Sequence, residues 1–366
     1  MNNSCYLGID VGSISTNCVI ITPEGEVLSE IYKRGEGNPI ESVQQCLAQV
    51  MAQLPDSFHI KGVCTTGSGR ILAGAVVGAD VIKNEISAHA RAALQLYPDV
   101  RTIFEIGGQD SKVTILRDRA VVDFSMNLVC AAGTGSFLDS QARRLNITIE
   151  ELGSRALMSE NHTNIAGRCT VFAESDMIHK QQMGHDQKDI MMGLCHALVR
   201  NYLSNVCKGK EIKPPIILQG GVSANEGICR AFKEALQCDI IIPPYNMVMG
   251  AYGAAIIART SCIEKTNFRG YEVSTHSIIT NGFECGDCPN NCEIIEIIDD
   301  DKVIGRTGGR CGKWEGRIEP RESLKGTGPM CPVSGPSTDR EMEHKTRSQV
   351  DNVPDLIQIG VPKKRI

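Results

Sequence analysis

The chain has 366 residues, of which 42% are hydrophobic, and its formal net charge is −5 at pH 7. This length suffices for two or three domains, and the mildly acidic balance gives no indication of nucleic-acid binding. No apolar run approaches the ~18 residues of a membrane-spanning helix, and the first residues, MNNSCYLGID, lack the basic region of a signal peptide. We therefore expect a cytoplasmic protein that binds neither membranes nor nucleic acid.

Strand and helix patterns alternate before residue 262 with few breakers, which predicts an α/β fold. The predicted strands are residues 6–10, 18–22, 62–66, 102–106, 113–116 and 120–124. The predicted helices are residues 40–53, 137–145, 189–207 and 224–236.

Two helix starts have the spacing of a capping box, Thr148 with Glu151 and Ser223 with Glu226. Three histidines stand singly on helical patterns, which is typical of hydrogen-bonded structural residues: His89, His185 and His196.

Sixteen cysteines are a high count for this chain. Because we expect no export signal, disulfides are not the first interpretation. Several cysteines stand singly inside apolar segments: Cys18, Cys64, Cys195 and Cys207. We expect buried, reduced thiols there and metal or cluster ligation by a few others.

Glycine-rich turns recur at the ends of predicted strands. Residues 8–16, GIDVGSIST, and residues 105–112, EIGGQDSK, share a plan of strand, small residues, aspartate and second strand. Residues 218–225, LQGGVSAN, join a strand to a helix through two glycines. Glycine lets the backbone approach a phosphate, whose oxygens then bind hydroxyls, amides or a helix N-terminus. Each turn alone is also typical of an ordinary tight turn, but three in this order predict a nucleotide site.

The residue types in these turns suggest their roles. Aspartates at strand ends suit a hydrated Mg²⁺, which prefers one or two carboxylates with water and phosphate. The catalytic candidates are therefore Asp10 and Asp110, with Gln109 as an alternative group to position water. The nucleotide-binding candidates are Gly12, Ser13, Ser15, Thr16, Gly107, Gly108, Gly220, Gly221 and Asn225.

At this point the sequence resembles the actin/sugar-kinase/Hsp70 ATPases. Within them it resembles the ATP-dependent activators of 2-hydroxyacyl-CoA dehydratases and the ATPase subunits of benzoyl-CoA reductase. The resemblance extends over residues 5–260 and rests on the stretches LGIDVGS, TTGSGR, EIGGQDSK, CAAGTGSFLD, CTVFAES and GGVSAN. One departure is Asn17, where the activators carry lysine.

The resemblance implies two ribonuclease-H-like lobes that close over ATP, and a homodimer that holds one 4Fe–4S cluster between its subunits. Each subunit of such a dimer gives two cysteines, which correspond to Cys130 and Cys169 here. Each of these precedes a run that could open a helix, where the helix dipole stabilises a thiolate. The alternative from the residues alone is a pair of buried core thiols.

The amino-acid composition changes after residue 262, where glycine, proline, cysteine and charged residues become frequent. A hairpin pattern covers residues 293–298 and 302–306. The spacing of Cys285, Cys288, Cys292 and Cys311 indicates a metal site, either zinc or a second iron–sulfur site. A reduced, cysteine-rich turn is the alternative.

Three segments follow from these patterns. Residues 1–262 are the predicted actin-like ATPase domain of two lobes, with the cluster-ligating helices in the second lobe. Residues 263–320 are the predicted metal or cluster segment, and residues 321–366 are a predicted linker and the start of a further domain.

The function implied by the resemblance is an ATPase that sends low-potential single electrons to a 2-hydroxyacyl-CoA dehydratase or a benzoyl-CoA-reductase-type enzyme. Ferredoxin or flavodoxin is the expected donor, and ATP, Mg²⁺ and the shared 4Fe–4S cluster are the expected cofactors. The alternative is a small-molecule kinase of the acetylhexosamine type, which needs an acceptor pocket with an aspartate base and no cluster.

Overall fold

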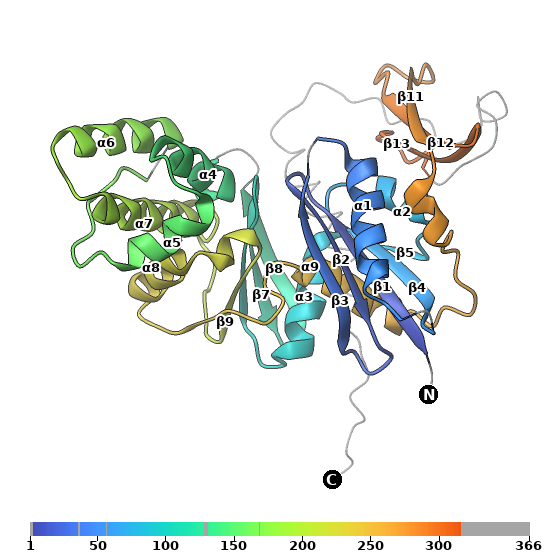
Figure 1. Cartoon of the computed structure of the whole chain (residues 1–366), viewed down its shortest axis with the longest axis horizontal. Helices are drawn as coiled ribbons and strands as arrows, with labels where there is room; N and C mark the ends of the chain where they lie inside the picture. The colour runs from blue at the N-terminus through green and yellow to red at the C-terminus, as the bar shows by residue number, and fades with distance from the viewer. Residues whose placement is uncertain (1–2, 36, 56, 128–130, 168, 316–366) are drawn as a thin grey trace, which may run out of the picture. The chain divides into compact units, whose positions relative to one another are not determined.

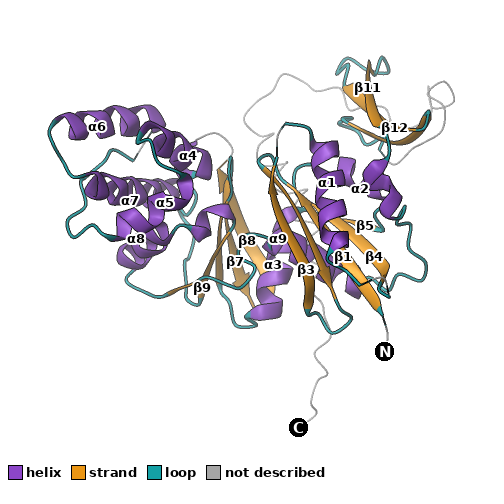
Figure 2. Ribbon diagram, viewed as in Figure 1, coloured by secondary structure: helices purple, strands orange, loops and turns teal. Residues whose placement is uncertain are grey.

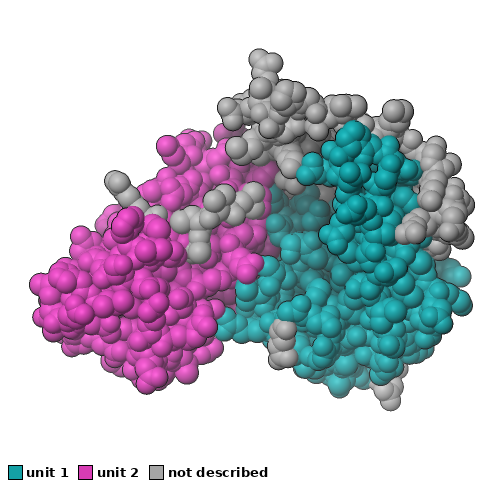
Figure 3. Space-filling model, turned by 90° about the horizontal axis from the view of Figure 1, so that it is seen from above, with its two compact units in different colours: residues 1–88, 250–366 teal, residues 89–249 magenta. Residues whose placement is uncertain are grey.

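The computed structural model describes residues 3–35, 37–55, 57–127, 131–167 and 169–315 (Figure 1). The chain forms two compact units, coloured separately in Figure 3. Unit 1 comprises residues 1–88 and 250–366, and unit 2 comprises residues 89–249. Helices and strands alternate in both units (Figure 2), which confirms the predicted α/β class.

The first sheet of unit 1 has the strand order β3-β2-β1-β4-β5. Its first three strands form antiparallel hairpins, whereas β4 and β5 join in parallel. The strands are β1 (Ser4–Val11), β2 (Ser15–Ile21), β3 (Val27–Arg34), β4 (His59–Thr66) and β5 (Val81–Ile82). The connecting helices are α1 (Pro39–Ala52) and α2 (Arg70–Val77).

Both faces of strand β1 are buried, so its apolar residues do not alternate with polar ones as they do in a strand with one exposed face. Leu7 and Ile9 belong to the core that includes Val43 and Leu47 of α1. On the other face, helix α9 (Met249–Thr260) crosses β1 so closely that a Cβ added at Gly8 would lie 1.9 Å from the carbonyl oxygen of Ala251. Glycine is therefore required where this helix meets the central strand.

The sheet of unit 2 repeats this topology, with the order β10-β9-β6-β7-β8. Strands β6, β7 and β8 form antiparallel hairpins, and β9 and β10 join in parallel. The strands are β6 (Thr102–Ile106), β7 (Ser111–Arg117), β8 (Ala120–Asn127), β9 (Ile216–Gln219) and β10 (Ile240–Ile241). The helices are α3 (Glu85–Leu96), which begins in unit 1, and α4 (Gly135–Arg144), α5 (Ile149–Leu157), α6 (Thr170–Gln182), α7 (Gln187–Asn205) and α8 (Glu226–Leu236).

A third sheet lies in the cysteine-rich part of the chain and has the antiparallel order β11-β12-β13. Its strands are β11 (Ile278–Glu284), β12 (Glu293–Asp299) and β13 (Lys302–Thr307). The turn between β12 and β13 places Asp300 and Asp301 at positive φ, as a tight hairpin turn requires. This confirms the hairpin predicted from the sequence, whereas β11 was not predicted.

One of the two predicted capping boxes is confirmed and the other is wrong. Thr148 and Glu151 cap α5 reciprocally. The N-cap of α8 is Asn225 instead of Ser223, because Ser223 lies in a 3₁₀ turn and donates its hydroxyl to the Gly220 carbonyl at 2.6 Å.

The three predicted domain segments stay a prediction. Residues 321–366, predicted as a linker, lie outside the described residues. Among the residues described, none of the helices combines the length and the apolar character that a membrane crossing requires.

Candidate functional site

Asp10 is the second-to-last residue of β1, next to the hairpin turn that leads to β2. The turn is closed by the Gly12 amide, which donates to the Ser15 carbonyl at 2.9 Å. Gly12 and Ser13 are exposed and Ser15 is half-buried, whereas Thr16 is only 2% exposed. The predicted first loop thus presents Gly12, Ser13 and Ser15 beside Asp10, and the Thr16 side chain is directed into the protein.

A second turn packs against Asp10. In it, the Gly69 amide donates to the Val11 carbonyl at 2.8 Å, and Gly67 has φ of +87°. A Cβ at Gly67 would lie 2.4 Å from Asp10 Oδ1. This turn belongs to the stretch TTGSGR, for which the sequence predicted no role beyond the family resemblance. Its two glycines directly after a strand were the signal that this turn approaches another functional group.

The second predicted loop, at the start of β7, lies against the N-terminus of α4 in unit 2. The Gly107 amide donates to the Asp110 carbonyl at 3.0 Å, which closes the turn. The Gly135 amide donates to the Gly107 carbonyl at 2.9 Å, and the Ser136 hydroxyl donates to the Gly108 carbonyl at 2.5 Å. Gln109, at the tip of this turn, is exposed.

The third predicted loop meets the second one. Gly220 has φ of +87°, and a Cβ there would lie 2.6 Å from the Ile106 carbonyl oxygen. A Cβ at Gly135 would lie 3.2 Å from both the Gly107 oxygen and a methyl group of Val222. Unit 2 therefore gathers the predicted residues Gly107, Gly108, Gly220 and Gly221, and small side chains leave the backbone accessible, as a nucleotide phosphate needs.

Asn225 has a structural role in this arrangement. Its Oδ1 accepts a hydrogen bond from the Ile228 amide at 3.0 Å and so caps α8. A contact between its side chain and a nucleotide stays a prediction.

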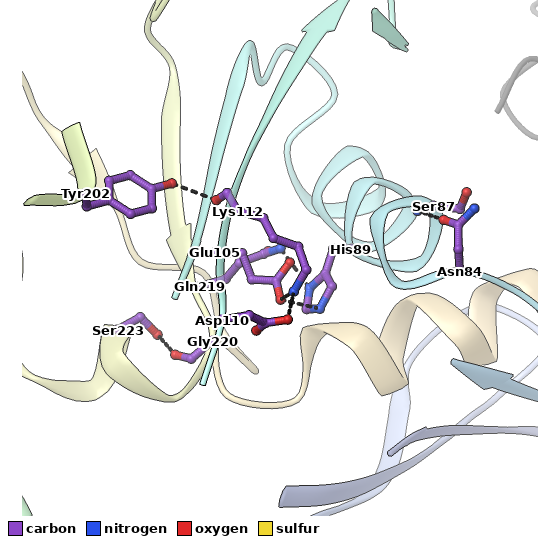
Figure 4. Close-up of polar contacts among 10 residues, drawn as sticks. All are labelled: Asn84, Ser87, His89, Glu105, Asp110, Lys112, Tyr202, Gln219, Gly220 and Ser223. Atoms are coloured by element: carbon purple, nitrogen blue, oxygen red, sulfur yellow. Dashed lines mark hydrogen bonds and ion pairs between the residues drawn. The ribbon is translucent and has the colours of Figure 1, made fainter. Parts of the chain in front are cut away.

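Asp110 is held by a lysine to which the sequence analysis assigned no role. Lys112 Nζ lies 2.8 Å from Asp110 Oδ2 and 3.0 Å from Glu105 Oε1 (Figure 4). The lysine side chain is 1% exposed, whereas that of Asp110 is 35% exposed. Because Asp110 reaches solvent while its partner is buried, the carboxylate is both fixed and accessible, as a ligand for hydrated Mg²⁺ must be. Glu105, Asp110 and Lys112 all lie in the EIGGQDSK motif, but the motif did not show that the Lys112 side chain would be buried in contact with both carboxylates.

Cys169 is the N-cap residue of α6 and is half-buried. Two residues of the first helical turn beside it, Val171 and Phe172, are each 66% exposed. A thiol at a helix N-terminus, next to an apolar surface, fits the ligand of a cluster shared with another subunit. Cys130, the other predicted ligand, lies outside the described residues.

The predicted C-terminal ligands lie close along the chain, but their sulfurs do not converge. The Cys285 amide donates to the Cys292 carbonyl at 2.8 Å, and the Cys285 sulfur accepts from Trp314 Nε1 at 3.2 Å. Among the described residues, three metal-ligand atoms come within 4.8 Å of one another only at His276, Asp299 and Asp300. The structure therefore does not show the geometry that a four-cysteine zinc site needs, and metal binding there stays a prediction.

The single cysteines inside apolar segments are confirmed as buried free thiols: Cys18, Cys64, Cys195 and Cys207. Burial raises the pKa of Cys64, Cys195 and Cys207 to about 12. Such thiols remain protonated and are poor ligands and nucleophiles.

A family model described as the BadF/BadG/BcrA/BcrD ATPase family matches residues 7–258. The 2-hydroxyisocaproyl-CoA dehydratase activator of Clostridioides difficile is 36% identical over 256 residues, which are 69% of this chain and 94% of the relative. The (R)-2-hydroxyglutaryl-CoA dehydratase activating ATPase of Acidaminococcus fermentans is 33% identical over 255 residues, 69% of this chain and 96% of the relative.

Two solved structures are similar in fold as well. One is the activator of the 2-hydroxyisocaproyl-CoA dehydratase from Clostridium difficile with bound ADPNP, with a TM-score of 0.65 and 33% identity over 70% of this chain and 94% of that one. The other is component A of the Acidaminococcus fermentans (R)-2-hydroxyglutaryl-CoA dehydratase, with a TM-score of 0.64 and 31% identity over 70% of this chain and 97% of that one.

Proposed function

Because the chain belongs to the BadF/BadG/BcrA/BcrD ATPase family, we propose that it is an ATP-hydrolysing iron–sulfur activator that transfers low-potential single electrons to a CoA-ester dehydratase or reductase. The observation that supports this most is the pairing, in one chain, of the predicted phosphate loops with Cys169 at the N-cap of a helix that has exposed apolar residues in its first turn. The named relatives are dehydratase activators, which does not favour the kinase alternative.

Hydrolysis in this proposal depends on the residues at the ends of the strands. Asp10 and Asp110 would hold the hydrated Mg²⁺ and orient the attacking water, with Gln109 as the alternative group for the water. The glycine turns bind phosphate oxygens through their amides. Fixed charges and dipoles at such a site lower the barrier, because they need no rearrangement as charge develops.

The electron-transfer part of the proposal assigns Cys130 and Cys169 as ligands that a homodimer shares. A 4Fe–4S cluster bound by the four thiolates of two chains would supply a one-electron carrier. Cys169 at the N-cap of α6 would place its sulfur at the helix end that bears a partial positive charge, which suits an anionic cluster. Lowering a one-electron potential by ~59 mV requires about 1.4 kcal/mol, so ATP hydrolysis is a sufficient source for a shift of a few hundred millivolts.

The partners follow from the same proposal. A 2-hydroxyacyl-CoA dehydratase or benzoyl-CoA-reductase-type iron–sulfur enzyme accepts the electron, and ferredoxin or flavodoxin supplies it in the cytoplasm.

The test is iron and sulfide analysis with EPR of the protein purified without oxygen. We expect one 4Fe–4S cluster per dimer in the unmodified chain, and loss of iron in Cys130→Ser and Cys169→Ser with nucleotide binding retained. Cys262→Ser is the matched control, because Cys262 is exposed and lies outside both motifs. Iron at the unmodified level in both ligand variants would show that the assignment is wrong.

A further inference from the structure

A row of polar side chains crosses the end of the unit 2 sheet. In the strand register, Glu105 of β6 stands opposite Lys112 of β7 on one side and opposite Gln219 of β9 on the other. Directly opposed residues point to the same face of a sheet. All three are buried, at 8%, 1% and 0% exposure respectively. Buried sheet positions usually hold apolar side chains, but these three hold a carboxylate, an ammonium and an amide.

Contacts join this row to helix α3. His89 belongs to α3. Its Nε2 is 3.4 Å from Glu105 Oε1, and its Nδ1 is 2.8 Å from Gln219 Nε2 (Figure 4). Burial by itself would raise the pKa of Glu105, but the neighbouring His89 and Lys112 lower it below its usual range. The carboxylate is therefore ionised, and it attracts the Lys112 ammonium at 3.0 Å.

The ammonium reaches Asp110 from the buried side. Its contact with Asp110 Oδ2, at 2.8 Å, leaves the other carboxylate oxygen over Gly107, where an added Cβ would lie 3.0 Å from Asp110 Oδ1. The main chain of Lys112 is fixed as well, because the Tyr202 hydroxyl donates to its carbonyl at 2.6 Å. The two oxygens of Asp110 thus have different surroundings: Oδ2 contacts the buried ammonium of Lys112, and Oδ1 lies beside Gly107.

We propose that Lys112 is a positioning residue for Asp110, and that Glu105, itself held by His89, fixes the Lys112 ammonium so that one Asp110 oxygen stays directed to the reacting magnesium nucleotide. This inference rests on the proposed ATPase role of Asp110. A buried ion pair contributes little net stability compared with apolar residues of similar size, so stability alone does not account for the row. The contact between Lys112 and the partly exposed Asp110 carboxylate gives this buried row a function that accounts for its presence.

The experiment compares Lys112→Met, Lys112→Arg and Glu105→Gln with Asp110→Asn and with the double variant Asp110→Asn/Lys112→Met. We measure kcat and KM for MgATP, the Kd of a fluorescent ADP analogue without Mg²⁺, and the thermal midpoint. We expect Lys112→Met to lower kcat about 10- to 100-fold, as loss of a residue that orients a metal ligand commonly does. The Kd of the analogue should stay within about threefold. Lys112→Arg should recover part of the loss, and Glu105→Gln should give a smaller loss in the same direction.

The double variant separates positioning from a general structural effect. If Lys112 acts through Asp110, the double variant is as slow as Asp110→Asn alone; independent effects would instead multiply. Arg306→Met is the matched control, because it breaks a buried pair with Glu296, 2.8 Å away, outside the site. It should lower the thermal midpoint and leave kcat unchanged.

The outcomes distinguish this inference from the function on which it rests. An Asp110→Asn variant of full activity would overturn both the role of Asp110 and the inference. If Asp110→Asn is slow while the Lys112 and Glu105 variants keep full activity, the inference alone is overturned. Losses of kcat that multiply in the double variant would also overturn it. If Lys112→Met does not fold, Lys112→Arg and Glu105→Gln decide by the same comparison of kcat with Kd.

Discussion

Asp10 lies in strand β1 of the first sheet, whereas Asp110 lies in the turn that leads into β7 of the second sheet, and the surroundings of the two carboxylates differ as well. The Asp10 carboxylate lies against the backbone of the Gly67 turn, whereas the Asp110 carboxylate is bound to a buried lysine. Glycine at position 67 lets this turn approach the Asp10 carboxylate closely, and the Lys112 ammonium restrains Asp110. The two aspartates are therefore not interchangeable in the proposed mechanism.

Neutralising either aspartate should slow hydrolysis more than it weakens binding. For Asp10→Asn and Asp110→Asn we expect kcat to fall about 10²- to 10³-fold, the range for a lost electrostatic contributor, with a nucleotide Kd changed only a few-fold. Single-turnover hydrolysis and equilibrium binding measure the two effects separately. Asp118→Asn, at positive φ in the β7–β8 turn, is a control that asparagine tolerates well. Wild-type turnover in either test variant would remove that aspartate from the mechanism.

The surroundings of His196 lead to a prediction of how the free energy of unfolding depends on pH. Its ring stacks on His162 with 4.0 Å between centroids, and burial, followed by the nearby His162, lowers the pKa of His196 to about 4. In the unfolded chain a histidine pKa is about 6.5. The unfolded state thus binds more protons below pH 6.5, so stability falls as pH falls from about 6.5 to about 4.

The loss approaches about 3 kcal/mol over that interval if His196 is the main contributor. Thermal unfolding at pH 7.5, 6 and 5 measures it, and His196→Asn should flatten the decline. His179→Asn, on the exposed side of α6, should keep the wild-type pH dependence. An equally steep decline in His196→Asn would assign the effect to other groups.

At the scale of elements, α6 and the residue that follows it leave several apolar side chains exposed. Val171, Phe172, Ile178 and Met183 are between 37% and 66% exposed. An apolar surface of this kind typically marks an interface. It lies on the helix that begins at Cys169, as the proposed shared cluster requires.

Phe172→Ser should therefore weaken the proposed dimer. Removing a buried phenylalanine from an interface commonly lowers the binding free energy by about 2 kcal/mol, which raises the dimer Kd about 30-fold. Sedimentation equilibrium without oxygen measures this Kd. Val122→Ser is the control, because Val122 is exposed on β8 of the same unit. A dimer Kd that is equal in both variants would place the interface elsewhere.

The region of β11, β12 and β13 contains a fluorescent reporter of the predicted C-terminal metal site. The chain has one tryptophan, and Trp314 Nε1 donates to the Cys285 sulfur. A metal bound by Cys285, Cys288, Cys292 and Cys311 would deprotonate these thiols and change the surroundings of the indole.

If these cysteines bind a metal, a strong chelator should shift the Trp314 emission of the full chain, and added Zn²⁺ should restore it. Cys292→Ser should abolish the response. His276→Asn should retain it, because that change affects only the separate group of His276, Asp299 and Asp300. An emission spectrum that neither chelator nor Zn²⁺ alters would leave these cysteines as a reduced turn.

At the scale of the whole molecule, the proposal requires that nucleotide hydrolysis and electron transfer depend on each other. The reduced protein, mixed with a dehydratase-type or benzoyl-CoA-reductase-type partner, should reduce the partner's cluster only with hydrolysable ATP. Catalytic amounts should suffice, and rapid-freeze EPR of the partner follows the transfer. The Asp110→Asn variant should bind ATP and transfer slowly. Equal transfer without nucleotide would contradict the coupling.

Local signals determined much of the fold. Strand β6 has the predicted bounds, and α1, β8 and the β12–β13 hairpin begin within two residues of prediction, because apolar periodicity and turn residues act over a few positions. The Thr148 capping box was recognisable for the same reason, since its partners are three residues apart. The family and its fold were recognisable because the phosphate loops are short contiguous motifs.

Tertiary structure decided what depends on distant segments. The motif containing Lys112 did not show that this side chain would be buried beside Glu105, with His89 and Gln219 brought next to them from α3 and β9. Asn225 takes the place of Ser223 as the cap of α8, because the chain first makes a 3₁₀ turn after Gly220, which packs against the Ile106 carbonyl of a different strand. Sequence by itself determined where many of the strands and turns form, since these are local. The surroundings of each catalytic candidate depended on strand neighbours and helix packing, which bring together residues up to 130 positions apart.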